Sequence, residues 1–268
     1  MIEAVTLDFG NTLVPVTGAG LGGVVGETVA AIAGRLGPFD ATEVRAAWAD
    51  ERERQFREEV PQFREVDLAQ RISRILARMR GMPPPAPDQR WDDAAASQLS
   101  DGAEIAWAVE SYSAAFVEAM PPDPCAMAVI EALAARYRVA ILSNWPLAAT
   151  IDRYADAAGW TPHLAAIVVS QRVGTIKPHP GIFAAARAAL GDPAPWAIVH
   201  VGDDWAADVV GAKGVGWHAA WLVSRQEDSP LPTSSPDASV EADAVIRGIG
   251  ELPDAIAGLV AADHRRGG

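Results

Sequence analysis

Strands and helices alternate from residue 125 onward, and this alternation restricts the fold more than any other feature of the sequence. Four apolar segments with strand character follow one another, RVAILSN, AAIVVS, WAIVHVGDD and WHAAWLV, and a helical segment precedes each of them. Strands separated by helices pair in parallel, and helices then cover both faces of the sheet. Residues 2–7 (IEAVTL) alternate in polarity and are predicted to add a buried strand. The sequence therefore predicts an α/β fold with a doubly wound parallel sheet.

A helical region interrupts this pattern between the first strand and the rest of the sheet. Apolar residues spaced as one face of a helix mark it, namely Leu68, Ile72, Ile75, Leu76 and Met79. Stacked prolines in the GMPPPAP run (81–87) must break the helical region. We expect one α/β core domain made of residues 1–15 and 121–268, with an all-helical domain inserted at 16–120. Residues 224–242 are polar and proline-rich and are predicted to form a surface loop.

The glycine-rich run GAGLGG (18–23) fits the G-x-G-x-x-G pattern of dinucleotide-binding loops. It begins ten residues after Asp8, however, and the turn that follows the first strand is already occupied by Asp8. We interpret the run as a flexible hinge into the inserted domain.

Charge and composition exclude several classes of partner. The formal net charge is −13 over 268 residues, which disfavours nucleic acid and anionic membranes. The single cysteine, Cys125, allows no internal disulfide and fits a reducing compartment. No segment has the length of a membrane span or the layout of a signal peptide. We therefore expect a cytoplasmic protein, monomeric or homodimeric, with a small-molecule substrate.

Polar residues collect where the predicted strands end. Ligands of open parallel sheets bind at the carboxyl ends of the strands. The residues at or near those ends are Asp8, Ser143, Asn144, Asp203, Asp204 and, between two predicted elements, Lys177. A strand-end Asp or Ser often only caps a helix or turn, but several on one sheet edge predict a site. Lys177 is one of only two lysines and lies in the segment GTIKPHPGIF, which favours a specific role.

Four motifs in a fixed order resemble those of the haloacid dehalogenase (HAD) superfamily. They read LDFGNTL, ILSN, KPHPGIF and VGDDWAADVVGAKGVG. The resemblance extends from residue 2 to about residue 223 and implies a Rossmann-like HAD core with a helical C1 cap. The last motif and the SNWP segment are most similar to the branch of HAD-like hydrolase domain-containing proteins, some of which lack the second acid of the first motif.

The resemblance implies a catalytic nucleophile and a metal site. Asp8 would form an aspartyl intermediate. A Mg²⁺ ion, which prefers oxygen ligands, would be held by Asp8, Asp203 and the backbone carbonyl of Gly10. Asp204 or Asp208 would support the outer shell of the ion.

The resemblance also implies residues that bind the phosphoryl group. Ser143 and the backbone of Asn144 would hold its oxygens, and Lys177 would neutralise the charge between Asp8 and the phosphate. Asn11 and Thr12, in the turn after Asp8, would complete the substrate-binding set.

Gly10 departs from the family pattern, because the residue two positions after the nucleophile normally protonates the leaving group. General acid–base help of this kind is worth roughly 10²–10⁴-fold in rate. We expect a Mg²⁺-dependent phosphatase of a small phosphorylated metabolite, weakened by Gly10 unless another acid, such as Glu27 of the cap, substitutes. The alternatives are a phospholigand-binding protein with little turnover and, less favoured, a dehalogenase, whose halide leaving group needs no proton.

The arginines of the cap are the remaining candidates for substrate contacts. We expect Arg71, Arg74 and Arg78 to form a solvated helix face. Arg35 and Arg45 are the less favoured candidates for an anionic substrate tail.

Overall fold

The computed structural model describes residues 1–266 and contains one parallel sheet of six strands in the order β3-β2-β1-β4-β5-β6. The strands are β1 (Ala4–Leu7), β2 (Arg138–Ser143), β3 (Ala166–Val169), β4 (Ile198–Gly202), β5 (His218–Leu222) and β6 (Ala244–Ile246). Leu7, at the end of β1, lies between Ile141 of β2 and Val201 of β4. The first strand of the chain is therefore central in the sheet, and the residue after it emerges in the middle of the sheet edge.

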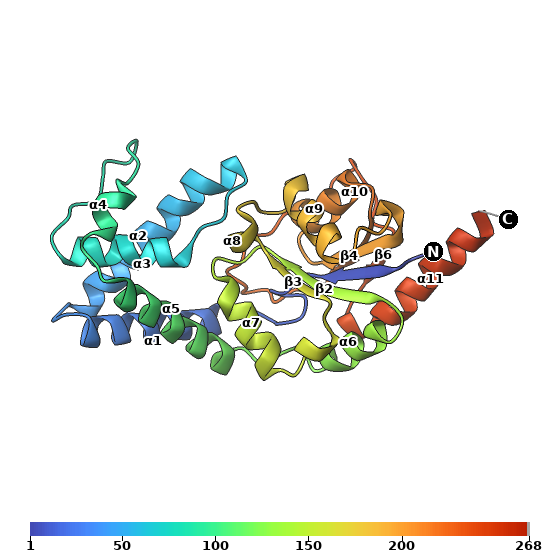
Figure 1. Ribbon diagram of the computed structural model, residues 1–268, viewed down its shortest axis with the longest axis horizontal. Coiled ribbons are helices and arrows are strands. Elements are labelled where there is room, and N and C mark those ends of the chain that lie inside the picture. Colours follow the sequence, from blue (N-terminus) through green and yellow to red (C-terminus); the bar gives the residue numbers. More distant parts are fainter. Residues whose placement is uncertain (267–268) are drawn as a thin grey trace.

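Helices cover both faces of the sheet, as the alternation predicted (Figure 1). One face carries α6 (Ala126–Ala134), α7 (Ala148–Ala157) and α11 (Leu252–Arg266), and the other carries α9 (Pro180–Ala189) and α10 (Gly211–Gly214). Successive strand residues point to opposite faces. In β2, accordingly, Val139 and Ile141 join one buried apolar cluster, and Ala140 and Leu142 join the other. The doubly wound α/β fold is confirmed.

Residues 16–120, the predicted insertion, contain helices and no strand, and they form one end of the molecule in Figure 1. Its helices are α1 (Gly18–Arg35), α2 (Ala41–Glu59), a 3₁₀ turn (Val60–Gln62), α3 (Leu68–Met79), α4 (Asp93–Ser97) and α5 (Gly102–Ala119). The proline run lies between α3 and α4, where a break was predicted. Within residues 1–266, no helix combines the length and apolar character needed to cross a membrane.

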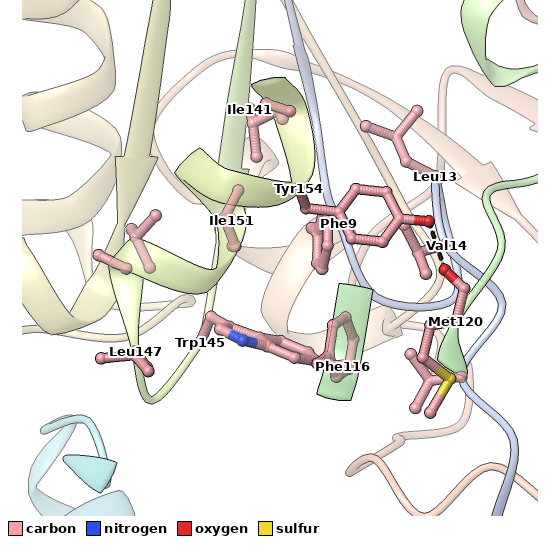
Figure 2. Close-up of a cluster of buried hydrophobic side chains, with 14 of the residues drawn as sticks. Phe9, Leu13, Val14, Phe116, Met120, Ile141, Trp145, Leu147, Ile151 and Tyr154 are labelled. Carbon is pink, nitrogen blue, oxygen red and sulfur yellow. Dashed lines mark hydrogen bonds between the residues drawn. The ribbon is translucent and has the colours of Figure 1, made fainter. Parts of the chain in front are cut away.

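Aromatic side chains join the insertion to the core beside the end of β1 (Figure 2). Phe9 makes edge contacts with Trp145 and Tyr154 at ring-centroid distances of 5.3 and 5.2 Å. Phe116 of α5 packs edge-on against Trp145 at 5.1 Å. The Tyr154 hydroxyl donates to the carbonyl of Met120, at the point where the chain re-enters the core. Edge-to-face pairs of this kind stabilise by about 0.5–1.5 kcal/mol each, so the cluster fixes the wall behind the turn that carries Asp8.

The prediction of a hinge at 18–23 is wrong, because these residues form the first turns of α1. Thr17 caps the helix, and its hydroxyl accepts a hydrogen bond from the Gly20 amide at 3.0 Å. The Gly18 amide donates to Asp228 at 3.0 Å, so the helix start is also tied to the segment 224–242. The threonine cap outweighs the low helix propensity of the glycines.

Two elements near the carboxyl terminus, β6 and α11, were not predicted. β6 is only three residues long, too short for a periodic signal, and it pairs with the sheet edge at β5. Residues 224–242 contain no helix or strand, as predicted, but they fold back over the carboxyl edge of the sheet, where they line the site described next.

Candidate active site

Asp8 lies at the carboxyl end of β1, where a hydrogen bond to β4 and the turn that follows it fix its position. Its amide donates to the Val201 carbonyl of β4 at 2.8 Å, and its side chain is buried. The following turn closes through bonds from Leu13 and Val14 to the Phe9 carbonyl, and Asn11 takes the left-handed conformation with φ of 59°. Asparagine tolerates this conformation better than most residues. Oδ2 of Asp8 lies 3.5 Å from the Thr12 hydroxyl, a weak contact that leaves this oxygen facing the site.

Lys177 is the cation nearest to Asp8. Its Nζ donates to Oδ1 of Asp8 and Oδ1 of Asp208, both at 2.7 Å, and to the Leu142 carbonyl at 2.9 Å. Burial alone would lower the pKa of Lys177, but the two carboxylates raise it above its usual value. The lysine is therefore a permanent positive charge in the site.

Asn144 sets the position of Lys177. Its Oδ1 accepts from the Lys177 amide at 2.7 Å, and its Nδ2 donates to the Lys177 carbonyl at 3.0 Å. The side chain of Asn144 is thus committed to the backbone of Lys177, and Ser143, the last residue of β2, lies buried beside it and lines the same cavity.

Three carboxylates converge on one point, because oxygens of Asp8, Asp203 and Asp208 all lie within 4.8 Å of one another. Burial and the neighbouring carboxylates raise the pKa of Asp203 to about 8. Burial also pushes the pKa of Asp208 upward, but Lys177 and His200 outweigh it and leave that pKa below its usual value. An all-oxygen donor set with uncompensated negative charge fits a divalent cation such as Mg²⁺.

Backbone and neighbouring side chains fix Asp208 in this cluster. Its Oδ2 accepts from the Asp204 amide at 2.9 Å, and its Oδ1 lies 3.0 Å from Nε2 of His200. A side chain at Gly202 would collide with Asp208, since its Cβ would stand 2.1 Å from a carboxylate oxygen. Glycine at the end of β4 is what lets Asp208 approach.

Neighbouring protein groups engage the side chains of Asp204 and Asn11. The Asp204 carboxylate caps the next helical turn by accepting from the Ala207 amide and from the Ser234 hydroxyl, both at 2.8 Å. Asn11 donates to Ser229 at 3.0 Å and lies 3.4 Å from Asp203. Their predicted roles toward metal and substrate stay predictions.

Arg225 is the residue of this site that the sequence analysis missed. Its Nη1 donates to Oδ2 of Asp203 at 2.9 Å and to the Pro232 carbonyl at 3.1 Å. The pair is largely buried, with side-chain exposures of 16% for Arg225 and 5% for Asp203. Arg225 is the only basic residue of the segment 224–242, but a loop without periodicity gives no signal for where it points.

The same segment covers Gly10. A Cβ added at Gly10 would lie 2.7 Å from Cδ1 of Leu231 and 3.3 Å from the ring of Trp145. The space in which a second acid would begin is therefore taken by Leu231.

A cavity of about 430 Å³ lies between the insertion and the core, with Asp8 and Lys177 in its wall. Its apolar lining includes Trp48, Phe56, Tyr112 and Trp145. Glu27, the suggested substitute acid, is exposed on α1, whereas Glu65 is the cap carboxyl that lines the cavity. Burial raises the pKa of Glu65 above its usual value.

The expectation of a solvated arginine face on α3 is wrong for Arg71 and Arg74, which are 5% and 2% exposed. Arg74 pairs with Asp93 of α4, and Arg71 lines the cavity. Arg35 lies over the ring of Trp107 at 4.4 Å, in a cation–π contact. Helical periodicity located α3 but did not indicate which of its polar residues face the cavity.

Two curated proteins are similar to part of the chain. Pyrimidine 5'-nucleotidase YjjG of Escherichia coli is 26% identical over 121 residues, which are 45% of this chain and 53% of that protein. Ribulose-1,5-bisphosphate 5-phosphatase of Halopiger xanaduensis is 32% identical over 150 residues, 55% of this chain and 62% of that protein. The chain thus matches less than two thirds of the length of either curated relative.

A solved structure and a family model cover more of the chain. The structure of 2-haloacid dehalogenase from Pseudomonas syringae pv. tomato DC3000 aligns with 97% of this chain and 100% of its own at a TM-score of 0.65 and 21% identity, which shows a shared fold. The family model described as haloacid dehalogenase-like hydrolase matches residues 2–216. With its six-stranded parallel sheet and helical insertion, the chain belongs to the haloacid dehalogenase-like hydrolase family.

Proposed function

We propose that this hydrolase is a Mg²⁺-dependent phosphatase that acts on a small phosphorylated metabolite through an aspartyl-phosphate intermediate. The observation that carries the proposal is the position of Asp8, with Oδ1 bound to Lys177 and two further carboxylates close by. The names of the two curated relatives, a nucleotidase and a phosphatase, support the same reaction class.

The reaction follows from the two oxygens of Asp8. Oδ1 is fixed by Lys177, which leaves Oδ2 to attack phosphorus. The new bond joins Oδ2 to phosphorus, and the bond between phosphorus and the ester oxygen breaks. The leaving oxygen takes a proton from solvent, and water then cleaves the acyl phosphate, which regenerates the carboxylate and releases inorganic phosphate.

The protein supplies charge stabilisation from its own residues. Lys177 remains positive at neutral pH and lies beside Asp8, where negative charge collects on the phosphoryl oxygens. Asp8, Asp203 and Asp208 would hold the magnesium ion, which supplies further positive charge to the same oxygens when bound. Ser143 and the backbone of Asn144 are proposed to bind the phosphoryl oxygens.

A phosphometabolite panel with Mg²⁺, repeated with a chelator, tests the proposal. We expect phosphate release from at least one member, and from p-nitrophenyl phosphate, only when the metal is present. No release from any member would leave the second candidate from the sequence, a phospholigand-binding protein without turnover.

One observation favours a different reaction. Dehalogenases work without metal, and carboxylates crowded around Asp8 would repel it if no cation were present. Here Arg225 supplies a cation to Asp203, which weakens this objection. A metal-independent attack of Asp8 on the carbon of a 2-haloacid, with halide leaving, is therefore the competing candidate. Halide release from 2-haloacids that persists in chelator would support it and would contradict the phosphatase.

A further inference from the structure

Arg71 differs from Arg74, the other buried arginine of α3, because within residues 1–266 no carboxylate forms an ion pair with it. Arg74 is 2% exposed and makes a bidentate pair with Asp93, with Nε to Oδ1 at 2.7 Å and Nη2 to Oδ2 at 3.0 Å. Arg71 is 5% exposed, and its Nε donates to the neutral amide of Gln55 at 2.9 Å. Among residues 1–266, no carboxylate lies within ion-pair distance of Arg71, and its terminal nitrogens make no hydrogen bond; its guanidinium carbon lies 5.8 Å from the centroid of the Trp48 ring.

The carboxylates nearest to Arg71 are engaged elsewhere. Glu65 accepts from the Ser170 hydroxyl and from the Val66 amide. Asp67 caps α3 through the Gln70 amide at 2.9 Å and accepts from Gln171 at 2.9 Å. In the described part of the chain, both acids act on Arg71 through their charge, but neither forms an ion pair with it.

A second cation, Arg52, lies near Arg71 and increases the free-energy cost of burying the charge of Arg71. Burial lowers the pKa of Arg71 to about 10, and the charge of Arg52 acts in the same direction, while Tyr112, Glu65 and Asp67 oppose the shift without cancelling it. Both arginines line the cavity that contains Asp8. An unpaired buried charge is costly unless a partner of opposite sign completes it.

Aromatic rings belong to the lining of the cavity that also contains Arg71 and Asp8. Trp48 and Tyr112 stack at a centroid distance of 6.1 Å with 21° between their planes, and Phe56 and Trp145 belong to the same lining. Flat apolar surfaces of this kind suit a flat apolar group.

We propose that Arg71 binds a second anionic group, a carboxylate or a phosphate, on a substrate whose flat apolar body lies between that group and the scissile phosphate. Arg71 is then the specificity-determining residue of the cavity. The substrate class rests on the proposed function, because that function places the scissile phosphate at Asp8.

Paired phosphate esters that differ only in the charge of the far group test this proposal. The pairs are 4-carboxyphenyl against 4-carbamoylphenyl phosphate and 4-(carboxymethyl)phenyl against 4-(carbamoylmethyl)phenyl phosphate, with 1,4-phenylene bisphosphate as the phosphate-ended arm. We expect wild type to prefer the anionic member of at least one pair by about 10–100-fold in kcat/KM. Arg71→Met should abolish the preference, and Arg71→Lys should restore part of it.

Arg57→Met is the matched control, because Arg57 is an exposed arginine on the insertion helix α2. It removes the same charge and should keep the preference. Thermal unfolding adds a readout that a structural arginine would not give. Arg71→Met loses the hydrogen bond to Gln55 but no ion pair, so its unfolding temperature should fall by less than that of Arg74→Met, which loses a bidentate pair.

A binding measurement separates this proposal from the phosphatase. Calorimetry with the corresponding benzylphosphonates needs no turnover. An Arg71-dependent preference in binding without phosphate release would support the anion site and contradict the phosphatase. Turnover with equal rates for charged and neutral members, a preference that survives Arg71→Met, or no binding of any anionic probe would overturn the assignment of Arg71.

Discussion

Replacing Gly10 by aspartate tests how the site manages with one carboxylate where two are usual. Without an acid at this position, the leaving oxygen departs with little proton transfer. The turnover rate of wild type should therefore depend steeply on the pKa of the leaving group. Activated aryl phosphates should react far faster than alkyl phosphates. An added acid would raise turnover of alkyl phosphates by at most roughly 10²–10⁴-fold.

Leu231 sets a steric limit on this substitution. The new Cβ would approach Cδ1 of Leu231 to 2.7 Å, closer than carbon atoms allow, and the ring of Trp145 stands at 3.3 Å on another side. Overpacking of this kind costs about 1–3 kcal/mol. In a chain of this size, that cost corresponds to a fall of roughly 2–12 °C in the midpoint of thermal unfolding. The clash is with the end of a flexible side chain, so Leu231→Ala should relieve most of it.

A double-mutant cycle measures the coupling between the two positions. Gly10→Asp, Leu231→Ala and the double variant are compared by urea unfolding and by kcat/KM for an aryl and an alkyl phosphate. We expect the double variant to be more stable than the sum of the single changes predicts, by about 1–2 kcal/mol. It should also turn over alkyl phosphates faster than either single variant.

Two results would refute this reasoning. Additive stabilities would show that Leu231 does not occupy the space of a second acid. A flat dependence on leaving-group pKa in wild type would show that another group donates the proton, and Glu65, as the cap carboxyl in the cavity lining, would be the first to replace.

The other predictions concern single residues of the site. Asp8→Asn should lower turnover by more than about 10³-fold without lowering the unfolding temperature, and near-normal turnover would exclude the covalent mechanism. Lys177→Ala should destabilise the fold by about 3–5 kcal/mol in urea unfolding without metal, because it leaves buried carboxylates unpaired, and an unchanged stability would contradict this. Arg225→Gln should tighten Mg²⁺ binding by about five- to tenfold in calorimetry, because it frees Asp203, and an equal Kd would show that the pair does not compete with the ion. Glu65 has a raised pKa in the fold, so the stability that it contributes is present below its unfolded pKa and is lost as pH rises through the folded pKa. The Tm of Glu65→Gln should therefore rise relative to that of wild type between pH 4 and pH 8. A difference in Tm that stays constant with pH would exclude the effect.

The sequence was sufficient for the part of the site that the sheet itself positions. Because parallel strands end at one edge, Asp8 and Asp203 had to approach each other once their strands were recognised. The resemblance then placed Lys177 beside Asp8, and the structure brings its Nζ to 2.7 Å from Oδ1 of Asp8. These contacts follow from regular secondary structure, which periodicity detects.

The parts that could not be predicted depend on irregular chain and on side-chain pairing. Arg225 reaches Asp203 from a segment without helix or strand, so no spacing rule indicates its direction. Arg71 and Arg74 lie on the same helix and are alike in sequence terms, yet in the described part of the chain Arg74 pairs with Asp93 of α4 and Arg71 pairs with no carboxylate. The difference arises from the packing of α3 against its neighbours, which helical periodicity does not encode.

The net charge of the site depends both on the missing acid at Gly10 and on the cation that Arg225 supplies. Three carboxylates, Asp8, Asp203 and Asp208, face two cations, Lys177 and Arg225, when all are ionised. The remaining negative charge would repel a phosphate dianion, and a further acid beside Asp8 would increase the repulsion. A divalent cation bound to the carboxylates reverses the sign, so a phosphate ester should bind only together with or after the metal. A 2-haloacid carries a single negative charge, and for it the two cations already compensate most of the carboxylate charge. Measuring the order in which metal and anion bind therefore distinguishes the two reactions. A phosphatase should bind its ester only with or after the metal, whereas a dehalogenase should bind its 2-haloacid without metal.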